Sequence, residues 1–179
     1  LKNQLNPHML FNSLNTLRSL VREDQDKAQE YIQELSRVLR YTLQGNDSKS
    51  VTLRDEMEFV SAYIFLLKMR FEDNLSFDIR IDKQYDDHRL PPMAVQMLIE
   101  NAVKHNEISD RRPLSIRVYT EGEELVVTNP VQPKLTATAG TGVGLANLAK
   151  RYHLLYKCEI QITENKYFTV RIPLIPNAL

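Results

Sequence analysis

The period of the hydrophobic pattern changes near residue 73, and this change divides the 179-residue chain into two unlike parts. In residues 1–72 apolar side chains recur every three or four positions, which is the spacing of one face of an α-helix. From Leu75 onward several segments alternate apolar and polar residues, as half-buried β-strands do, and helical segments fall between them. We therefore expect an α+β protein, with a helical region at residues 1–72 and a sheet-containing domain at residues 73–179.

The first 43 residues predict a helical hairpin. Two helical patterns, the second at about residues 25–43, are separated only by residues 22–26, and so short a connection favours antiparallel neighbours. On the first helix an apolar stripe of Leu10, Leu14, Leu17 and Val21 is opposed by a polar stripe of His8, Asn12, Asn15 and Ser19. Two helices alone bury little surface, so we expect the hairpin to self-associate into a four-helix bundle in a homodimer.

A third helix and a sheet complete the predicted fold. Thr52, followed three residues later by Asp55, is a weak capping box for a helix that reaches Phe71. That helix either extends the bundle or connects it to the next domain. Strands are predicted near residues 75–81, 114–118, 125–128, 159–163 and 167–172, and helices near residues 93–105 and 145–155. One sheet with its helices on one face is the economical arrangement.

The composition argues against several classes of partner. The chain has 23 basic and 23 acidic side chains, so it offers no net charge to attract nucleic acid or anionic lipid. Its one cysteine, Cys158, excludes an internal disulfide and cannot build a thiolate metal site by itself. No apolar run approaches the roughly 20 residues that span a bilayer. Because the chain begins with Leu1 and enters a helical pattern at once, we expect a fragment of a longer protein.

The first motif whose residues could carry out chemistry is NPHMLFN, at residues 6–12. Asn6 is a good N-cap and Pro7 suits the first helical position, so His8 is expected in the first turn of a helix, facing solvent. Asn12 lies one turn further on the same stripe and can reach the imidazole or a water beside it. A neutral, solvent-facing imidazole is a competent nucleophile for a phosphoryl group.

The second motif is ENAVKHN, at residues 100–106, near the end of a predicted helix. Asn101, Lys104 and His105 are spaced to share the polar side of that helix. An amide oxygen can ligate a hard cation such as Mg²⁺, and an ammonium group can contact phosphate oxygens.

The third motif is GTGVGL, at residues 140–145, which opens a helix. Closely spaced glycines let backbone N–H groups approach an anion at the positive end of a helix. The pattern lacks the spacing of a dinucleotide fingerprint and the Lys-Ser/Thr of a P-loop. Each motif alone also has an ordinary explanation: a surface histidine, a solvated helix face and a flexible connection.

The order of the three motifs is more specific than any one of them. Residues 4–15 read QLNPHMLFNSLN, residues 91–105 read PPMAVQMLIENAVKH, and residues 140–151 read GTGVGLANLAKR. Together with Tyr63 and Arg70-Phe71, these segments resemble the sensor histidine kinases of the LytS type over essentially the whole chain.

The resemblance implies a dimerising helical hairpin followed by an ATP-binding α/β sandwich of the Bergerat type, the fold of gyrase and Hsp90, with a mixed sheet. It implies that His8 accepts the γ-phosphate of ATP and passes it to an aspartate of a response regulator. Asn101 would ligate Mg²⁺, and Lys104 and His105 would contact phosphates. Further nucleotide contacts would come from Asn129, Gly140, Gly142, Gly144 and Leu145. The chain would then be the cytoplasmic portion of an inner-membrane protein whose sensory segments lie upstream.

Two positions depart from the pattern of histidine kinases. Asn129 stands where an aspartate usually binds the adenine amino group, so its amide accepts that hydrogen bond without charge assistance, and we expect weaker nucleotide binding. Met9 follows the phosphoacceptor, where many histidine kinases carry an acidic residue that acts as the base. The base must come from elsewhere, or the neutral imidazole attacks unaided. Asn12 is a candidate for positioning a water that hydrolyses the phosphorylated regulator.

Two other functions fit part of the sequence. One is a dimeric signalling adaptor that has lost catalysis because its adenine-binding segment is degenerate. The other is an ATP-gated conformational machine like gyrase or Hsp90. Those proteins carry a catalytic glutamate one helical turn before the Mg²⁺-binding asparagine, and Met97 occupies that position here.

Overall fold

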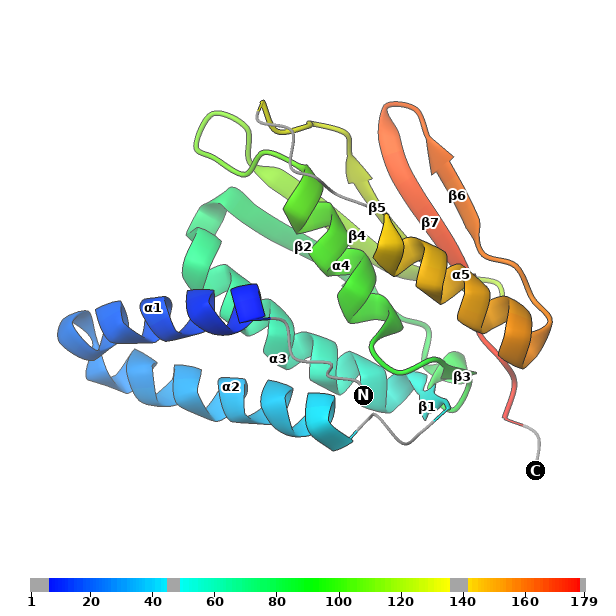
Figure 1. The fold of residues 1–179 in the computed structure, drawn as a ribbon, viewed down its shortest axis with the longest axis horizontal. Helices are drawn as coiled ribbons and strands as arrows, with labels where there is room; N and C mark the ends of the chain where they lie inside the picture. Colours follow the sequence, from blue (N-terminus) through cyan, green and yellow to red (C-terminus); the bar gives the residue numbers. More distant parts are fainter. Residues whose placement is uncertain (1–6, 45–48, 136–141, 178–179) are drawn as a thin grey trace.

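An antiparallel helical hairpin begins the computed structural model, which describes residues 7–44, 49–135 and 142–177. The hairpin consists of α1 (Pro7–Glu23) and α2 (Gln25–Gln44), joined through Asp24 alone (Figure 1). Asp24 begins the second helix, because its side-chain oxygen accepts a hydrogen bond from the Lys27 backbone N–H at 3.2 Å. The predicted hairpin is therefore confirmed.

The side of α1 that is buried differs from the predicted apolar stripe. Ser13 is buried, and Met9, Leu17 and Leu20 pack against the core. Leu14 and Val21, which belong to the predicted stripe, are 49% and 50% exposed. The reason is that α1 lies on α2 and α3 with an adjacent stripe of its surface, so part of its apolar face is left uncovered within one chain.

The third helix, α3 (Leu53–Phe71), starts as predicted: the Thr52 hydroxyl accepts a hydrogen bond from the Asp55 backbone N–H at 3.1 Å. It follows a two-residue strand, β1 (Val51–Thr52), which pairs with β3 (Arg89–Leu90) in a small sheet that the hydrophobic pattern did not reveal. The helix packs against α2 on one side and contacts α4 and β2 on the other. It thus both extends the hairpin and connects it to the sheet, and the division at residue 72 stays a prediction.

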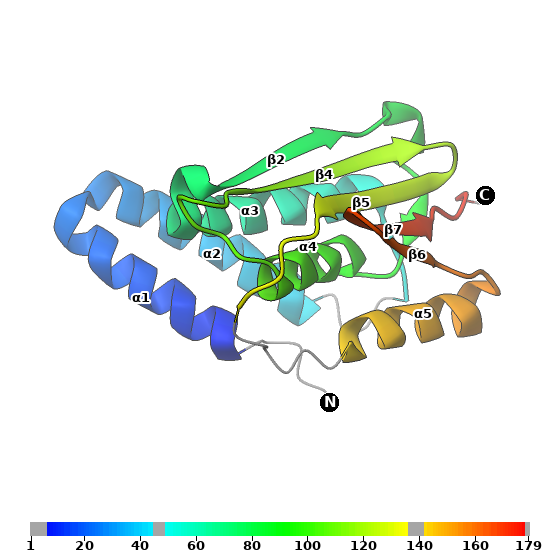
Figure 2. The same ribbon diagram turned by 90° about the horizontal axis from the view of Figure 1, so that it is seen from above.

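A five-stranded mixed sheet forms the rest of the fold, in the order β2-β4-β5-β7-β6. Only β2 and β4 run parallel, and the other neighbouring strands are antiparallel. The helices α3, α4 and α5 cover one face of this sheet, as expected (Figures 1 and 2). The strands are β2 (Leu75–Arg80), β4 (Leu114–Glu121), β5 (Glu124–Pro130), β6 (Gln161–Glu164) and β7 (Tyr167–Pro173), and the helices are α4 (Ala94–His105) and α5 (Val143–Tyr156).

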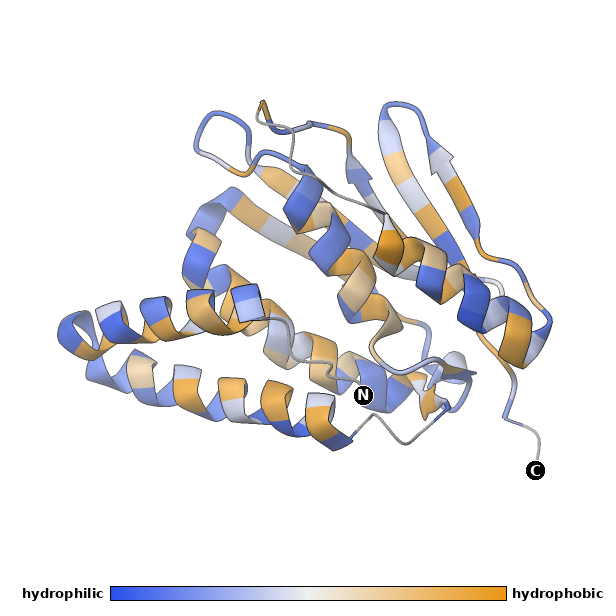
Figure 3. Ribbon diagram, viewed as in Figure 1, coloured by the Kyte–Doolittle hydropathy of each residue, from blue (hydrophilic) through white to orange (hydrophobic). Residues whose placement is uncertain are grey.

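The observed elements differ slightly from the predicted ones in their bounds and connections. The β6 strand starts at Gln161, two residues later than predicted, and all four of its residues are exposed at the edge of the sheet. The turn between β4 and β5 is at Gly122, whose φ of 59° glycine adopts readily. Two 3₁₀ turns, η2 (Glu72–Asn74) and η3 (Lys83–Tyr85), flank β2. Along β7, apolar and polar residues alternate as in the predicted strand (Figure 3).

A buried carboxylate joins the hairpin, α3 and the start of α4. Glu56 of α3 is fully buried, and its Oε1 accepts hydrogen bonds from the Tyr41 hydroxyl at 2.8 Å and from the Met93 N–H at 3.0 Å. Its Oε2 accepts from the Val95 N–H at 3.0 Å. Burial raises the pKa of Glu56, and these hydrogen bonds oppose that shift. Since α4 has no side-chain cap of its own, Glu56 supplies acceptors for the free N–H groups of its first turn.

Candidate functional site

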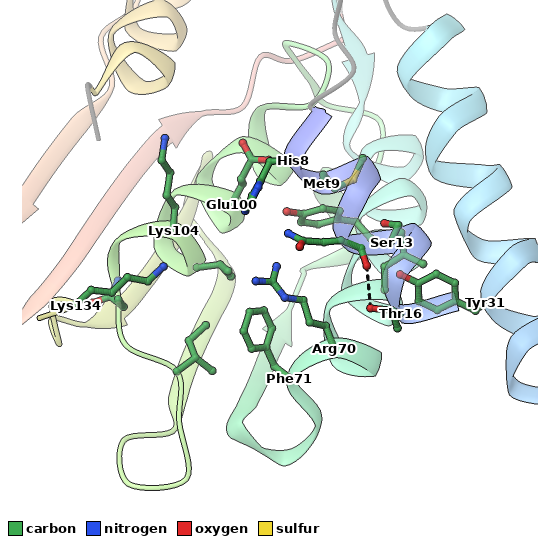
Figure 4. A pocket seen from close by; sticks show the side chains of 16 residues that line it. His8, Met9, Ser13, Thr16, Tyr31, Arg70, Phe71, Glu100, Lys104 and Lys134 are labelled. Atoms are coloured by element: carbon green, nitrogen blue, oxygen red, sulfur yellow. Dashed lines mark hydrogen bonds between the residues drawn. The ribbon is translucent and has the colours of Figure 1, made fainter. Parts of the chain in front are cut away.

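His8 lies in the first turn of α1 and is exposed, as predicted from Pro7 at the first helical position. It lines a cavity of about 480 Å³ that is bounded by α1, α3 and α4 (Figure 4). Asn12, one turn further along α1, lines the same cavity, so the predicted pairing of these two side chains on one surface is observed.

Three cationic side chains from separate elements surround this cavity. Lys104 comes from α4, Arg70 from the last turn of α3, and Lys134 from the segment after β5. The Arg70 guanidinium and the Lys134 ammonium face each other across the cavity (Figure 4). Of these three cations, only Lys104 was expected from the sequence to contact phosphates. Arg70 was noted only as part of a motif, and no pattern marked Lys134, because a loop carries no periodicity that would show where it folds.

The electrostatics of the cavity reflect this crowding of positive charge. The pKa of Lys134 is lowered by burial and by the charges of Arg70 and Lys104. The pKa of His105 is lowered by burial and by Lys104 and Lys134, which favours the neutral imidazole. One carboxylate, Glu100 of α4, also lines the cavity, at the end where His8 lies (Figure 4).

The glycine-rich motif meets α4 at Met97. Gly142 caps α5 with a φ of 66°, a left-handed conformation that strains other residues. A Cβ on Gly144 would lie 3.0 Å from the Met97 sulfur, so glycine permits the close approach of α5 to α4. Leu145 packs against the core, and Gly140 lies outside the described residues.

Asn101 lies on α4, one helical turn after Met97 and three residues before Lys104. Neither Asn101 nor His105 is among the described residues that line the His8 cavity. Of these neighbouring side chains of α4, Lys104 lines the cavity together with the phosphoacceptor.

Asn129 is near the end of β5 and is 2% exposed. Its Nδ2 donates a hydrogen bond to the Pro130 carbonyl at 2.7 Å. This bond orients the amide and makes Oδ1 the atom that can accept a hydrogen bond from a ligand.

Two buried polar residues that sequence analysis missed hold the segment after β5 against the end of α4. Asn106 donates to the Ala102 carbonyl at 2.8 Å and accepts a hydrogen bond from the Gln132 backbone N–H at 2.8 Å. The Gln132 side chain donates to the carbonyls of Glu107 at 2.8 Å and Arg112 at 3.0 Å. These bonds place Lys134 beside α4. The position of Asn106 directly after a helix could have indicated a structural role. Nothing in the sequence around Gln132 indicated that it would be the partner of Asn106.

The Asn101 amide could hold Mg²⁺ only together with a ligand that supplies further oxygen atoms. Within residues 7–44, 49–135 and 142–177, no group of three or more His, Cys, Asp or Glu side chains could hold a metal ion. Mg²⁺ is commonly held by one or two protein oxygens together with substrate phosphates and water, so a lone Asn101 amide fits a nucleotide-bound ion. Among the helices of the described chain, none has the length and apolarity needed to cross a membrane.

Comparisons with known proteins agree with these features. A family model described as histidine kinase matches residues 1–75. The sensor protein LytS of Streptococcus agalactiae serotype V is 34% identical over 174 residues, which cover 87% of this chain and 29% of LytS. The sensor histidine kinase BtsS of Escherichia coli K12 is 33% identical over 181 residues, covering 95% of this chain and 32% of BtsS. The chain thus spans about a third of the length of these curated relatives.

The fold also matches a solved histidine kinase. The cytoplasmic segment of histidine kinase QseC superposes with a TM-score of 0.52 at 11% identity, covering 74% of this chain and 80% of that one. The similarity to LytS and BtsS agrees with the helical hairpin, the mixed sheet and the three motifs. The chain therefore belongs to the sensor histidine kinases.

Proposed function

We propose that this chain is the phosphoacceptor and ATP-binding part of a two-component sensor histidine kinase, and that it phosphorylates itself on His8. The observation that carries the proposal is the placement of His8. Its exposed ring opens into a cavity whose far wall is the helix that carries Asn101 and Lys104.

The proposed reaction is a phosphoryl transfer. A ring nitrogen of His8 forms a bond to the γ-phosphorus of ATP, the bond from that phosphorus to the bridging oxygen breaks, and ADP leaves. Glu100 lines the same cavity as His8, so it is the carboxylate placed to take the ring proton that Met9 cannot accept. Positioning and charge neutralisation supply most of the catalysis in such reactions.

The proposed nucleotide contacts come from β5, from α4 and from the start of α5. Asn129 accepts a hydrogen bond from the adenine amino group, Lys104 and His105 contact phosphates, and the N-terminal end of α5 with Gly142 and Gly144 contributes backbone N–H groups. The same role is proposed for Gly140 and Leu145. Asn101 holds Mg²⁺, which neutralises charge on the phosphates when it is bound.

The partners follow from the surface of the hairpin and from the chemistry of phosphohistidine. Leu14, Val21 and Ile32 are each about half exposed, and burying them in a four-helix bundle with a second copy accounts for their position. The phosphoryl group then passes from His8 to an aspartate of a response regulator. In the full-length protein this chain is proposed to be the cytoplasmic portion attached to an inner-membrane sensor.

Asn12 is proposed to help switch the signal off, by positioning a water that hydrolyses the phosphorylated regulator. It lines the cavity beside His8, where an amide can hold such a water. The change Asn12→Ala should slow dephosphorylation of the regulator and spare autophosphorylation. Unchanged dephosphorylation in a phosphatase assay would discard this role.

The experiment that tests the proposal is incubation with γ-labelled ATP and Mg²⁺, with detection of acid-labile, base-stable label. We expect label on the wild type, none on His8→Gln, and undiminished label on His153→Gln, a matched control in an exposed histidine of α5. Asn101→Ala should also abolish labelling. Absence of label on a chain that dimerises would overturn the kinase assignment, and absence of ATP binding in the same chain would favour the adaptor.

A further inference from the structure

The cavity beside His8 holds more positive charge than the proposed nucleotide contacts require. Arg70, Lys104 and Lys134 all line it, and Glu100 is the one carboxylate among the described lining residues. None of these three cations takes part in an ion pair with a carboxylate of the described residues. Unbalanced cations held close together favour the binding of an anion.

The fold sets the positions of Arg70 and Lys134. The Arg70 guanidinium lies over the Phe71 ring, 4.5 Å from its centroid, which orients it. Lys134 follows the segment that Asn106 and Gln132 bind to the end of α4. Burial and the nearby charges of Arg70 and Lys104 lower the pKa of Lys134, as expected for three cations that line one cavity.

The ligand is identified by what shares the cavity. His8 opens into the same space, and a phosphoryl group on its ring would enter carrying about two negative charges. We propose that Arg70 and Lys134, together with Lys104, form an anion site that holds the phosphoryl group carried by His8. The inference rests on the proposed phosphorylation of His8. It adds that the phosphohistidine is held against α3 and α4 of its own chain instead of being left in solvent.

The test uses phosphoramidate, a small donor that needs neither ATP nor Mg²⁺. A ring nitrogen of His8 attacks its phosphorus, the P–N bond breaks, and ammonia leaves. Phosphohistidine is followed by intact mass and by ³¹P NMR after the donor is removed, and His8→Gln defines the background from the other histidines. The donor bypasses the nucleotide site, so failure of ATP labelling and failure of the anion site give different results.

We expect Arg70→Gln and Lys134→Gln each to shorten the lifetime of phosphohistidine by about threefold to tenfold, as expected for the loss of one partly screened charge. The double variant should lose more. Arg117→Gln is the matched control, because Arg117 also lies over an aromatic ring, 5.0 Å from the Tyr119 centroid, and does not line the cavity. Lys83→Gln serves the same purpose for lysine. Unfolding midpoints confirm that each variant is folded.

Three results would overturn the proposal. The first is a double variant whose phosphohistidine lives as long as that of the wild type. The second is a loss of ATP affinity with an unchanged lifetime, which would make the cations part of the nucleotide site only. The third is a wild-type His8 that does not react with phosphoramidate, because cations around an exposed imidazole should draw this anionic donor to it.

Discussion

At the scale of single residues, Asn129 shows how a small chemical change alters a binding site without altering the fold. Its Nδ2 is bound to the Pro130 carbonyl, so the side chain keeps one acceptor for a ligand and carries no charge. An aspartate in the same place could strengthen a hydrogen bond from an adenine amino group through its charge. The carboxylate would also face the Pro130 carbonyl, where no hydrogen bond is possible.

The change Asn129→Asp should therefore have two opposite effects. We expect ATP affinity to rise, measured by calorimetric titration, and the free energy of unfolding to fall by about 1–3 kcal/mol because the partly buried Pro130 carbonyl loses its donor. Asn129→Ala removes both features and should weaken ATP binding. Equal ATP affinity in the wild type and Asn129→Asp would contradict the assigned contact.

His105 gives a pH-dependent prediction. Burial, Lys104 and Lys134 lower its pKa below the ordinary value of 6.5. A histidine whose folded-state pKa is depressed contributes stability that is present above the unfolded pKa and is lost as pH falls through the folded pKa. In an NMR titration, Lys134→Gln should raise the pKa of His105 by removing a repelling charge, and Lys83→Gln should leave it unchanged. An unmoved pKa in Lys134→Gln would argue that the two side chains do not interact.

Glu100 is the residue proposed to replace the base missing at Met9. The change Glu100→Gln keeps its shape and removes its basicity, so autophosphorylation from ATP should slow by about a hundredfold or more. The affinity for ATP should change little. If the rate is unaffected, the neutral imidazole attacks without a base from this cavity.

At the scale of elements, Glu56 of α3 connects α2 to α4 through hydrogen bonds. Its two oxygens accept hydrogen bonds from α2 and from the first turn of α4, so one side chain of α3 fixes two neighbouring helices. Tyr41 adds a stacked contact with Phe59, with ring centroids 4.2 Å apart. The start of the helix that carries Asn101 is therefore positioned from outside itself.

The change Glu56→Gln should be disruptive although it keeps the shape of the side chain. The new NH₂ group must face an N–H or O–H donor, and we expect a loss of about 2–3 kcal/mol in the free energy of unfolding by urea denaturation. Tyr41→Phe removes one hydrogen bond and keeps the ring, so it should cost about 1 kcal/mol. A Glu56→Gln variant as stable as the wild type would show that the carboxylate does not hold α4.

At the scale of the whole molecule, the phosphoacceptor and the helix of the nucleotide site meet within one chain. His8 and Lys104 line one cavity of a single copy, so we expect phosphorylation in cis within the proposed dimer. In mixed dimers of His8→Gln with Asn101→Ala, neither chain should take label from ATP. Mixed dimers of His8→Gln with wild type provide the positive control, and label on the Asn101→Ala chain would establish transfer between subunits.

The features that depend on residues close together in the chain could be predicted from the sequence. The hairpin, the alternating strands, the Thr52 cap and the exposed His8 all follow from local pattern, and all are observed. The missed features depend on residues far apart in the chain. Arg70 and Lys134 share a cavity only because the sheet brings α3 and the segment after β5 to the same helix, and Glu56 lies 37 residues from the Met93 N–H that it accepts.

The link between Tyr41 and Glu56 also bears on the design of chimeric sensors. A foreign input hairpin grafted at residue 72 would replace Glu56 and leave the first turn of α4 without its acceptors. A graft placed between α2 and β1 would keep Glu56 but would still lose its hydrogen bond from Tyr41, unless the new helix carries a tyrosine at the matching position. Successful chimeras should therefore be those that transplant or rebuild this pair, whatever signal the new hairpin receives.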